Sequence, residues 1–136
     1  MSETRSPDPS GSTACFRITT SAGATVLAAA GELDLTVTGR LAALLHRELG
    51  LGPAAMVFDA TAVTFCSART VTILVTTAAD AKAAGIPFAI VTRSSAVLRP
   101  LTALGLEREL PVHGDLGQAL AWLELLPQLA EPVTES

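Results

Sequence analysis

Lysine and arginine are scarce in this sequence. The chain has 136 residues, of which 9 are basic and 13 acidic, so the formal net charge is −4 and the isoelectric point is near 5.0. Binding to nucleic acid or to an anionic membrane requires clustered basic side chains. The composition therefore argues against a nucleic-acid partner and against a membrane partner.

Long apolar runs are also missing. No stretch of about 18 apolar residues occurs, so no segment is expected to span a membrane. Residues 1–13 are rich in Ser, Pro, Thr, Gly and charge, and they lack the apolar segment of a signal peptide. We predict disordered tails at residues 1–13 and 129–136, flanking one domain at residues 14–128.

Cysteine is rare, and metal-binding patterns are absent. Cys15 and Cys66 each lie in an apolar context, which predicts two buried, reduced thiols in a cytoplasmic protein. The sequence has no metal-ligand spacing and no glycine-rich phosphate loop. We therefore expect neither a metal nor a cofactor.

Apolar residues, in contrast, are abundant. They make up 49% of the chain, and the mean hydropathy is +0.47, as in a globular domain with a sizeable core. Their spacing predicts a hairpin of residues 16–18 and 25–30, a helix over 35–49 ended by Gly50, a strand at 56–58 that ends at Asp59, a helix from Thr70 to Gly85, and a strand at 87–91.

The last third of the chain continues this alternation of helix and strand. Ser94 or Ser95 is a candidate N-cap for a helix that stops at Gly105, although Pro100 lies inside it. Residues 109–112 predict a short edge strand or connection, and Asp115 caps a final helix with Trp122 at its rim. The expected fold is an α/β sandwich with a mixed four- to five-stranded sheet and about four helices, mostly on one side.

Three segments together resemble the STAS-type anti-sigma factor antagonists. Gly31-Glu-Leu-Asp34 resembles the family's turn into the first helix, and Val57-Phe-Asp59 with Val63-Thr-Phe65 resembles its strand and the approach to the regulatory loop. Residues 94–101 with Gly105-Leu106 resemble a third family segment. The resemblance covers about residues 14–126, in the family's order and spacing, and implies the STAS fold.

The family's regulatory motif is Asp-Ser-Ser/Thr-Gly-Leu, whose first hydroxyl residue accepts phosphate from a partner that is both a kinase and an anti-sigma factor. The matching positions here are Ser67 for the Asp, Ala68 for the phosphoacceptor, Arg69 for the second hydroxyl residue, Thr70 for the Gly and Val71 for the Leu. Because Ala68 has no hydroxyl, we expect no phosphorylation switch at this position.

Five residues form the expected partner-binding set: Asp34, Ser67, Ala68, Arg69 and Thr70. Ser67 is interpreted as the N-cap of the second helix, with a displaced phosphoacceptor as the alternative. Thr70 is expected to be polar surface of the first turn. Asp34 is either the cap of the first helix or a contact residue. Arg69 places a cation at the positive end of the second helix, where it could receive an acidic group of the partner.

The sequence gives little support to the hypothesis that this protein is an enzyme. His46 and His113 have no evident catalytic partner, and pairing of Cys66 with His113 is less favoured than a buried core thiol. Asp59 follows an apolar strand, as in phosphoaccepting receiver domains, but no acidic pair accompanies it. We therefore expect a protein that is not an enzyme.

Two functions remain open from the sequence. The first is a STAS-type regulator of sigma factor activity that binds an anti-sigma factor of the histidine-kinase-like ATPase type. The second is a ligand- or nucleotide-sensing STAS domain, with an anion held by Arg69 and the backbone N–H groups at the start of the second helix.

Overall fold

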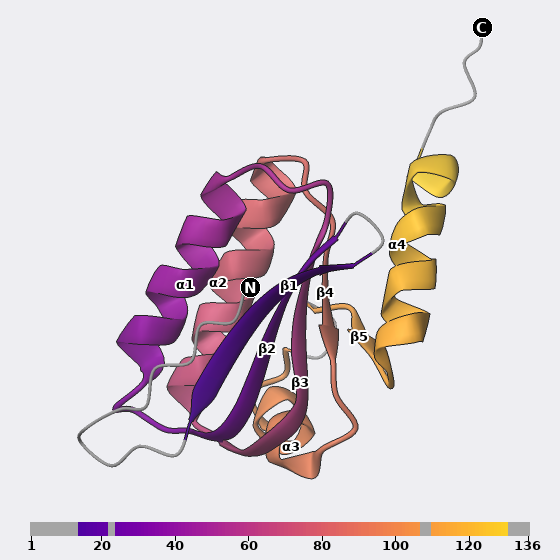
Figure 1. The fold of residues 1–136 in the computed structure, drawn as a ribbon. Helices are drawn as coiled ribbons and strands as arrows, with labels where there is room; N and C mark the ends of the chain where they lie inside the picture. The colour runs from indigo at the N-terminus through magenta and orange to yellow at the C-terminus, as the bar shows by residue number, and fades with distance from the viewer. Residues whose placement is uncertain (1–13, 22–23, 107–109, 131–136) are drawn as a thin grey trace, which may run out of the picture.

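The computed structural model describes residues 14–21, 24–106 and 110–130, which form strands and helices in alternation after an initial hairpin (Figure 1). The elements are β1 (Cys15–Ser21), β2 (Ala24–Leu33), α1 (Thr38–Gly50), β3 (Met56–Cys66), α2 (Ala68–Ala83), β4 (Phe88–Val91), α3 (Ser95–Ala103), β5 (Val112–His113) and α4 (Leu116–Ala130). Helix α4 runs past the predicted domain end at residue 128. The predicted tail at 1–13 and residues 131–136 of the tail predicted at 129–136 lie outside the described residues.

The five strands form one mixed sheet in the order β1-β2-β3-β4-β5. Strand β1 is antiparallel to β2, whereas the other neighbouring strands are parallel to each other. The hairpin, the mixed sheet and the four helices that the sequence predicts are confirmed. The short edge strand or connection predicted at residues 109–112 overlaps β5 only at Val112, and β5 lies at the edge of the sheet.

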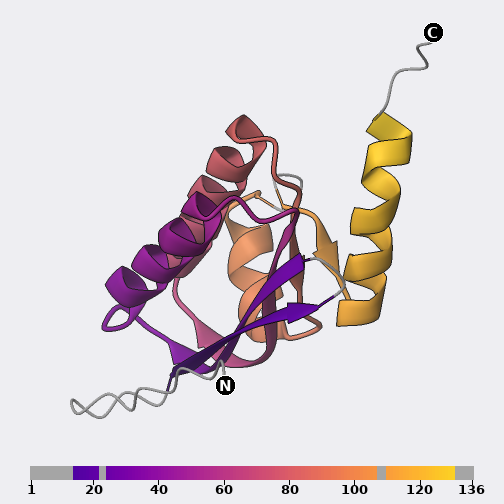
Figure 2. The ribbon, with the colours of Figure 1, turned by 45° about the horizontal axis from the view of Figure 1, so that its top comes forward.

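Helices cover both faces of the sheet, because both faces carry apolar side chains. The larger core lies under α1, α2 and α3, which contribute buried leucines and valines such as Leu41, Leu45, Leu74 and Val97. The smaller core lies on the opposite face under α4 and includes Leu123. Figure 2 shows α4 alone on its side of the sheet. The prediction that most helices share one side is confirmed.

Three predicted helix caps are confirmed by hydrogen bonds. The Ser67 side chain accepts from Thr70 N at the start of α2, and Ser94 Oγ accepts from Ala96 N in α3. The Asp115 carboxylate accepts from Gln118 N at 2.8 Å at the start of α4. Each cap pairs a backbone N–H that the helix itself leaves without a partner.

The prediction for β3 is wrong in one respect. We expected the strand to end at Asp59, but it continues to Cys66. Its register with β2 shifts between Ala28 and Ala30, which pair with Asp59 and Ala62. Such an extra residue is a β-bulge, which bends a strand without ending it. The strand therefore reaches α2 directly.

No helix in the described part of the chain is both long and apolar enough to cross a bilayer.

Candidate partner-binding site

Strands β2 and β3 end side by side at the start of α2, and we call residues 32–36 and 65–70 the junction. Glu32 pairs with Phe65, and Leu33 pairs with Cys66. The carboxyl ends of parallel strands meet at one edge of a sheet, where α/β domains commonly place their functional residues. Asp34 follows Leu33, whose carbonyl accepts from Ser67 N, so Asp34 lies near the first turn of α2.

Gly31 sets the path of β2 into the junction. Its φ angle is 93°, a left-handed conformation that a residue with a Cβ adopts only at a cost. The β2–β3 register also shifts between Gly31 and Glu32. The glycine of the Gly31-Glu-Leu-Asp34 segment is therefore required by the backbone.

The Leu33 carbonyl joins β2 to α2. Its oxygen accepts from Ser67 N at 3.0 Å and from Thr70 Oγ1 at 3.1 Å. Thr70 is fully buried, so the prediction that it is polar surface of the first turn is wrong. Thr70 supports the junction from inside because its hydroxyl meets a carbonyl 37 residues away in sequence.

Ser67 is half-buried, and its hydroxyl is held within the first turn of α2. Ser67 Oγ accepts from Thr70 N at 3.2 Å and lies 3.0 Å from Thr70 Oγ1. A phosphate on this oxygen would displace both contacts. The geometry therefore favours the N-cap over the alternative of a displaced phosphoacceptor.

Ala68 and Arg69 are the first two residues of α2, and both are exposed. Arg69 lines a cavity of about 390 Å³ between α1 and α2, together with His46 and Asp80. Thr70 N, one of the N–H groups that could hold an anion at this helix start, is already bonded to Ser67. The alternative of a nucleotide or other anion here stays a prediction.

Asp34 lies in the turn between β2 and α1. Its Oδ1 accepts from Thr36 N at 3.0 Å and from Thr36 Oγ1. The N-cap of α1 is Val37, which makes no side-chain cap. The prediction that Asp34 caps this helix is therefore wrong, and its carboxylate shapes the turn before it.

Two large apolar side chains of the junction face solvent. Leu35 is 70% exposed and Phe65 is 49% exposed. Leu35 adjoins Asp34, and Phe65 lies two residues before Ser67. Nothing in the sequence signalled that these two residues are functional, because a large apolar side chain at the end of a predicted strand or helix is normally assigned to the core. Their exposure beside polar groups is typical of a protein-binding surface.

The two cysteines differ in environment, contrary to the prediction that both are buried. Cys66 is buried, whereas Cys15 is half-buried. Burial raises the pKa of the Cys66 thiol to about 11. The thiol donates a hydrogen bond to the Ser67 carbonyl oxygen, with Sγ and O 3.7 Å apart. A nucleophilic cysteine needs a lowered pKa, so this thiol is poorly suited to pairing with His113.

Thiol labelling tests this difference. At about pH 8, below the ordinary thiol pKa of about 8.5, a maleimide is expected to label Cys15 and to spare Cys66 in the folded protein. Intact-mass analysis should give one adduct, and Cys15→Ser should give none. Two adducts forming at similar rates in the folded chain would contradict the assigned burial of Cys66.

His113 lies away from the junction, in β5. Its ring contacts the Trp122 ring of α4 at a tilt of 46°, with centroids 5.0 Å apart. Trp122 is half-buried, as expected at a rim. In residues 14–21, 24–106 and 110–130, no group of three His, Cys, Asp or Glu side chains could hold a metal ion.

Comparison with known proteins gives one family and several similar folds. The model of the STAS domain family matches residues 16–119. An anti-sigma factor antagonist from Mycobacterium paratuberculosis superposes with a TM-score of 0.75 at 24% identity, covering 82% of this chain and 95% of that one. No curated protein sequence matches the chain.

Two further solved structures are similar. A variant of RsbS from Moorella thermoacetica has a TM-score of 0.70 at 25% identity and covers 83% of this chain and 97% of its own. The phosphorylated form of the Bacillus cell fate determinant SpoIIAA has a TM-score of 0.62 at 14% identity. That match covers 79% of this chain and 98% of SpoIIAA. These matches span nearly the whole of each similar protein.

Proposed function

This chain belongs to the STAS domain family, and we propose on that premise that it is an anti-sigma factor antagonist that binds its anti-sigma factor through the junction. Its role would be to bind rather than to catalyse. The similarity in fold to an anti-sigma factor antagonist supports the proposal.

The observation that carries the proposal is the exposure of Leu35 and Phe65 beside the start of α2. Large apolar side chains contribute most to affinity when a partner removes them from water, with polar groups around them setting the register. Asp34 and Arg69 supply those polar groups, with opposite charges. Thr70 is buried, so it shapes the surface without touching the partner.

We expect the partner to be of the histidine-kinase-like ATPase type, as the resemblance to STAS-type antagonists implies, and to offer an acidic group to Arg69. Arg69 is exposed near the positive end of α2, where it gains little from its own helix. An acidic group of the partner would stabilise this cation by a charge-assisted hydrogen bond. The exposed cation thus selects an anionic contact on the other protein.

Binding is expected to proceed without phosphorylation of this chain. Phosphoryl transfer needs a positioned hydroxyl group, and Ala68 offers none at the exposed first residue of α2. The hydroxyl of the preceding residue, Ser67, caps the helix. The antagonist would therefore stay available to its partner whatever the partner's ATP supply.

Co-incubation with histidine-kinase-like anti-sigma factors and Mg-ATP tests the proposal, with capture on immobilised chain and intact-mass analysis of the same sample. The expected result is stable capture of one anti-sigma factor and no added phosphoryl group. Ser67→Asn serves as the matched variant, because Asn caps helices as well as Ser but carries no hydroxyl. It should capture the same partner.

A phosphoryl adduct on the natural chain that Ser67→Asn abolishes would contradict the expected lack of phosphorylation and identify Ser67 as the acceptor. Failure to capture any such anti-sigma factor would contradict the proposed partner.

A further inference from the structure

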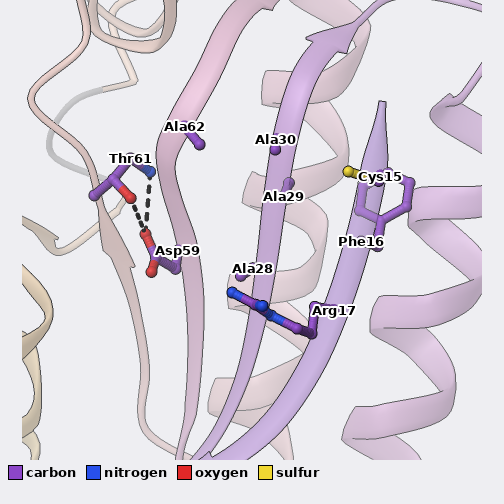
Figure 3. Close-up of a pocket in the computed structure, with 9 residues that line it drawn as sticks. All are labelled: Cys15, Phe16, Arg17, Ala28, Ala29, Ala30, Asp59, Thr61 and Ala62. Carbon is purple, nitrogen blue, oxygen red and sulfur yellow. Dashed lines mark hydrogen bonds between the residues drawn. The ribbon is translucent and has the colours of Figure 1, made fainter. Parts of the chain in front are cut away.

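The open part of the sheet's outer face holds a cavity of about 320 Å³ that the junction does not use. It adjoins the area that α4 covers. Val26 of β2 and Val57 of β3 lie under α4, and Ala28 and Asp59, two residues further along these strands, lie on the same face of the sheet. We call it the sheet-face cavity, and its lining includes Cys15, Arg17, Ala28, Asp59, Thr61 and Ala62 (Figure 3).

Three alanines leave space for a ligand on this face. Cys15 and Arg17 of β1 pair with Ala30 and Ala28 of β2, and Ala30 pairs with Ala62 of β3. Their methyl groups make a shallow apolar floor between longer side chains on either side. A volume near 300 Å³ is at the lower end of the range for small-molecule sites, so only a small ligand fits.

The β-bulge of β3 builds one wall of the cavity. Ala60 points into the core and is fully buried, whereas Thr61 and Ala62 are both exposed. A regular strand would alternate these side chains between the two faces. The bulge instead presents Asp59, Thr61 and Ala62 on the same face, and bulges commonly redirect side chains in this way at functional sites.

This wall accepts hydrogen bonds. Asp59 Oδ1 accepts from Thr61 N at 3.0 Å and from Thr61 Oγ1 at 2.8 Å. Asp59 Oδ2 takes part in neither bond. Because the Thr61 hydroxyl proton is directed at Asp59, the remaining lone pairs of Thr61 Oγ1 can only accept. Asp59 and Thr61 together therefore suit a cationic donor such as an ammonium group.

The opposite wall carries a cation. Arg17 is exposed, and its side chain extends from β1 across β2 beside Ala28, in the direction of Asp59 (Figure 3). It makes no hydrogen bond or ion pair with another described residue. Since adjacent strands lie about 4.8 Å apart, the backbones of Arg17 and Asp59 are separated by about 10 Å. The Arg17 guanidinium lies over β2 beside Ala28, and it makes no ion pair with Asp59.

We propose that the sheet-face cavity binds a small zwitterion of the amino-acid class. Its carboxylate pairs with the Arg17 guanidinium, which matches carboxylates in a bidentate way. Its ammonium group donates to Asp59 and Thr61, and its carbon chain lies on Ala30 and Ala62. An anion or a cation alone would satisfy only one of the two walls.

Amide chemical shifts of the full-length ¹⁵N-labelled chain test this assignment. The probes are glycine, β-alanine and γ-aminobutyrate, which differ in the spacing of their charges, with acetate and methylamine as ligands of a single charge. At least one zwitterion is expected to shift the Ala28, Ala30 and Ala62 amides saturably. Acetate and methylamine should bind about tenfold more weakly or worse, because each loses one charge-assisted interaction.

Two variants locate the binding. Asp59→Asn keeps an oxygen that can accept from Thr61, so the bulge is retained while the charge is lost. This variant and Arg17→Gln should each weaken zwitterion binding about tenfold or more. Arg99→Gln in α3 and Asp80→Asn in α2 are matched controls with the same charge changes at exposed positions, and they should leave binding unchanged.

Three outcomes would overturn the proposal. The first is no saturable shift with any zwitterion up to about 10 mM, tenfold above a Kd of about 1 mM. The second is binding that acetate reproduces equally and that only Arg17→Gln removes, which would mean adventitious anion binding. The third is a shift of these amides with protein concentration in the absence of ligand, which would assign this face to a second copy of the chain.

Discussion

Replacing Leu35 and Phe65 together by Asp is expected to weaken capture of the anti-sigma factor by about 100-fold or more. Each substitution removes a large apolar side chain from the contact and adds an unpaired charge that the partner would have to desolvate. Both residues are exposed in the unbound chain. The fold should therefore survive, and titration calorimetry with the captured partner measures the loss.

The matched control replaces Leu51 and Leu104 by Asp. These leucines are 73% and 47% exposed, close to the values for Leu35 and Phe65, and the change in net charge is the same. Leu51 follows α1, a helix of about 20 Å that begins beside the junction. The control should bind within about threefold of the natural chain, since it alters apolar surface outside the junction. Equal losses in the two double variants would contradict a contact centred on the junction.

Phe58→Ala is expected to lower the free energy of unfolding by about 3–5 kcal/mol. Phe58 is fully buried in the central strand β3, within the larger core. Truncation removes apolar contacts and leaves a cavity that close-packed neighbours refill only in part. Because domains of this size are stable by about 5–15 kcal/mol, the variant should unfold at a much lower urea concentration with a similar m-value.

Phe65→Ala is the matched control, because it makes the same change in the same strand. Phe65 keeps half of its surface in water, so the expected cost is about 1 kcal/mol. Similar costs for Phe58→Ala and Phe65→Ala would contradict the assignment of Phe58 to the core and Phe65 to the surface.

Local sequence signals predicted most of the fold. The apolar run at Met56–Phe58 gave a central strand, and the caps at Ser67, Ser94 and Asp115 were correct because each depends on a backbone N–H only two or three residues away. Helix periodicity was similarly reliable for α1 and α2, whose buried stripes contact a single core.

The errors arose where a residue's environment depends on distant parts of the chain. Asp59 and Thr61 have the composition of a turn, but pairing with β2 makes them part of a β-bulge. Thr70 is buried because its hydroxyl reaches the Leu33 carbonyl. The sheet-face cavity combines side chains of β1, β2 and β3, so no single segment of the sequence predicts it.

Hydrogen exchange on the chain alone and bound to the captured anti-sigma factor tests the central claim most directly. We predict slower exchange at residues 32–36 and 65–70, where the partner would cover the junction, and little change along α4 or at residues 28–30. Protection confined to α4 or to the sheet's outer face, with the junction unchanged, would contradict the proposed binding site.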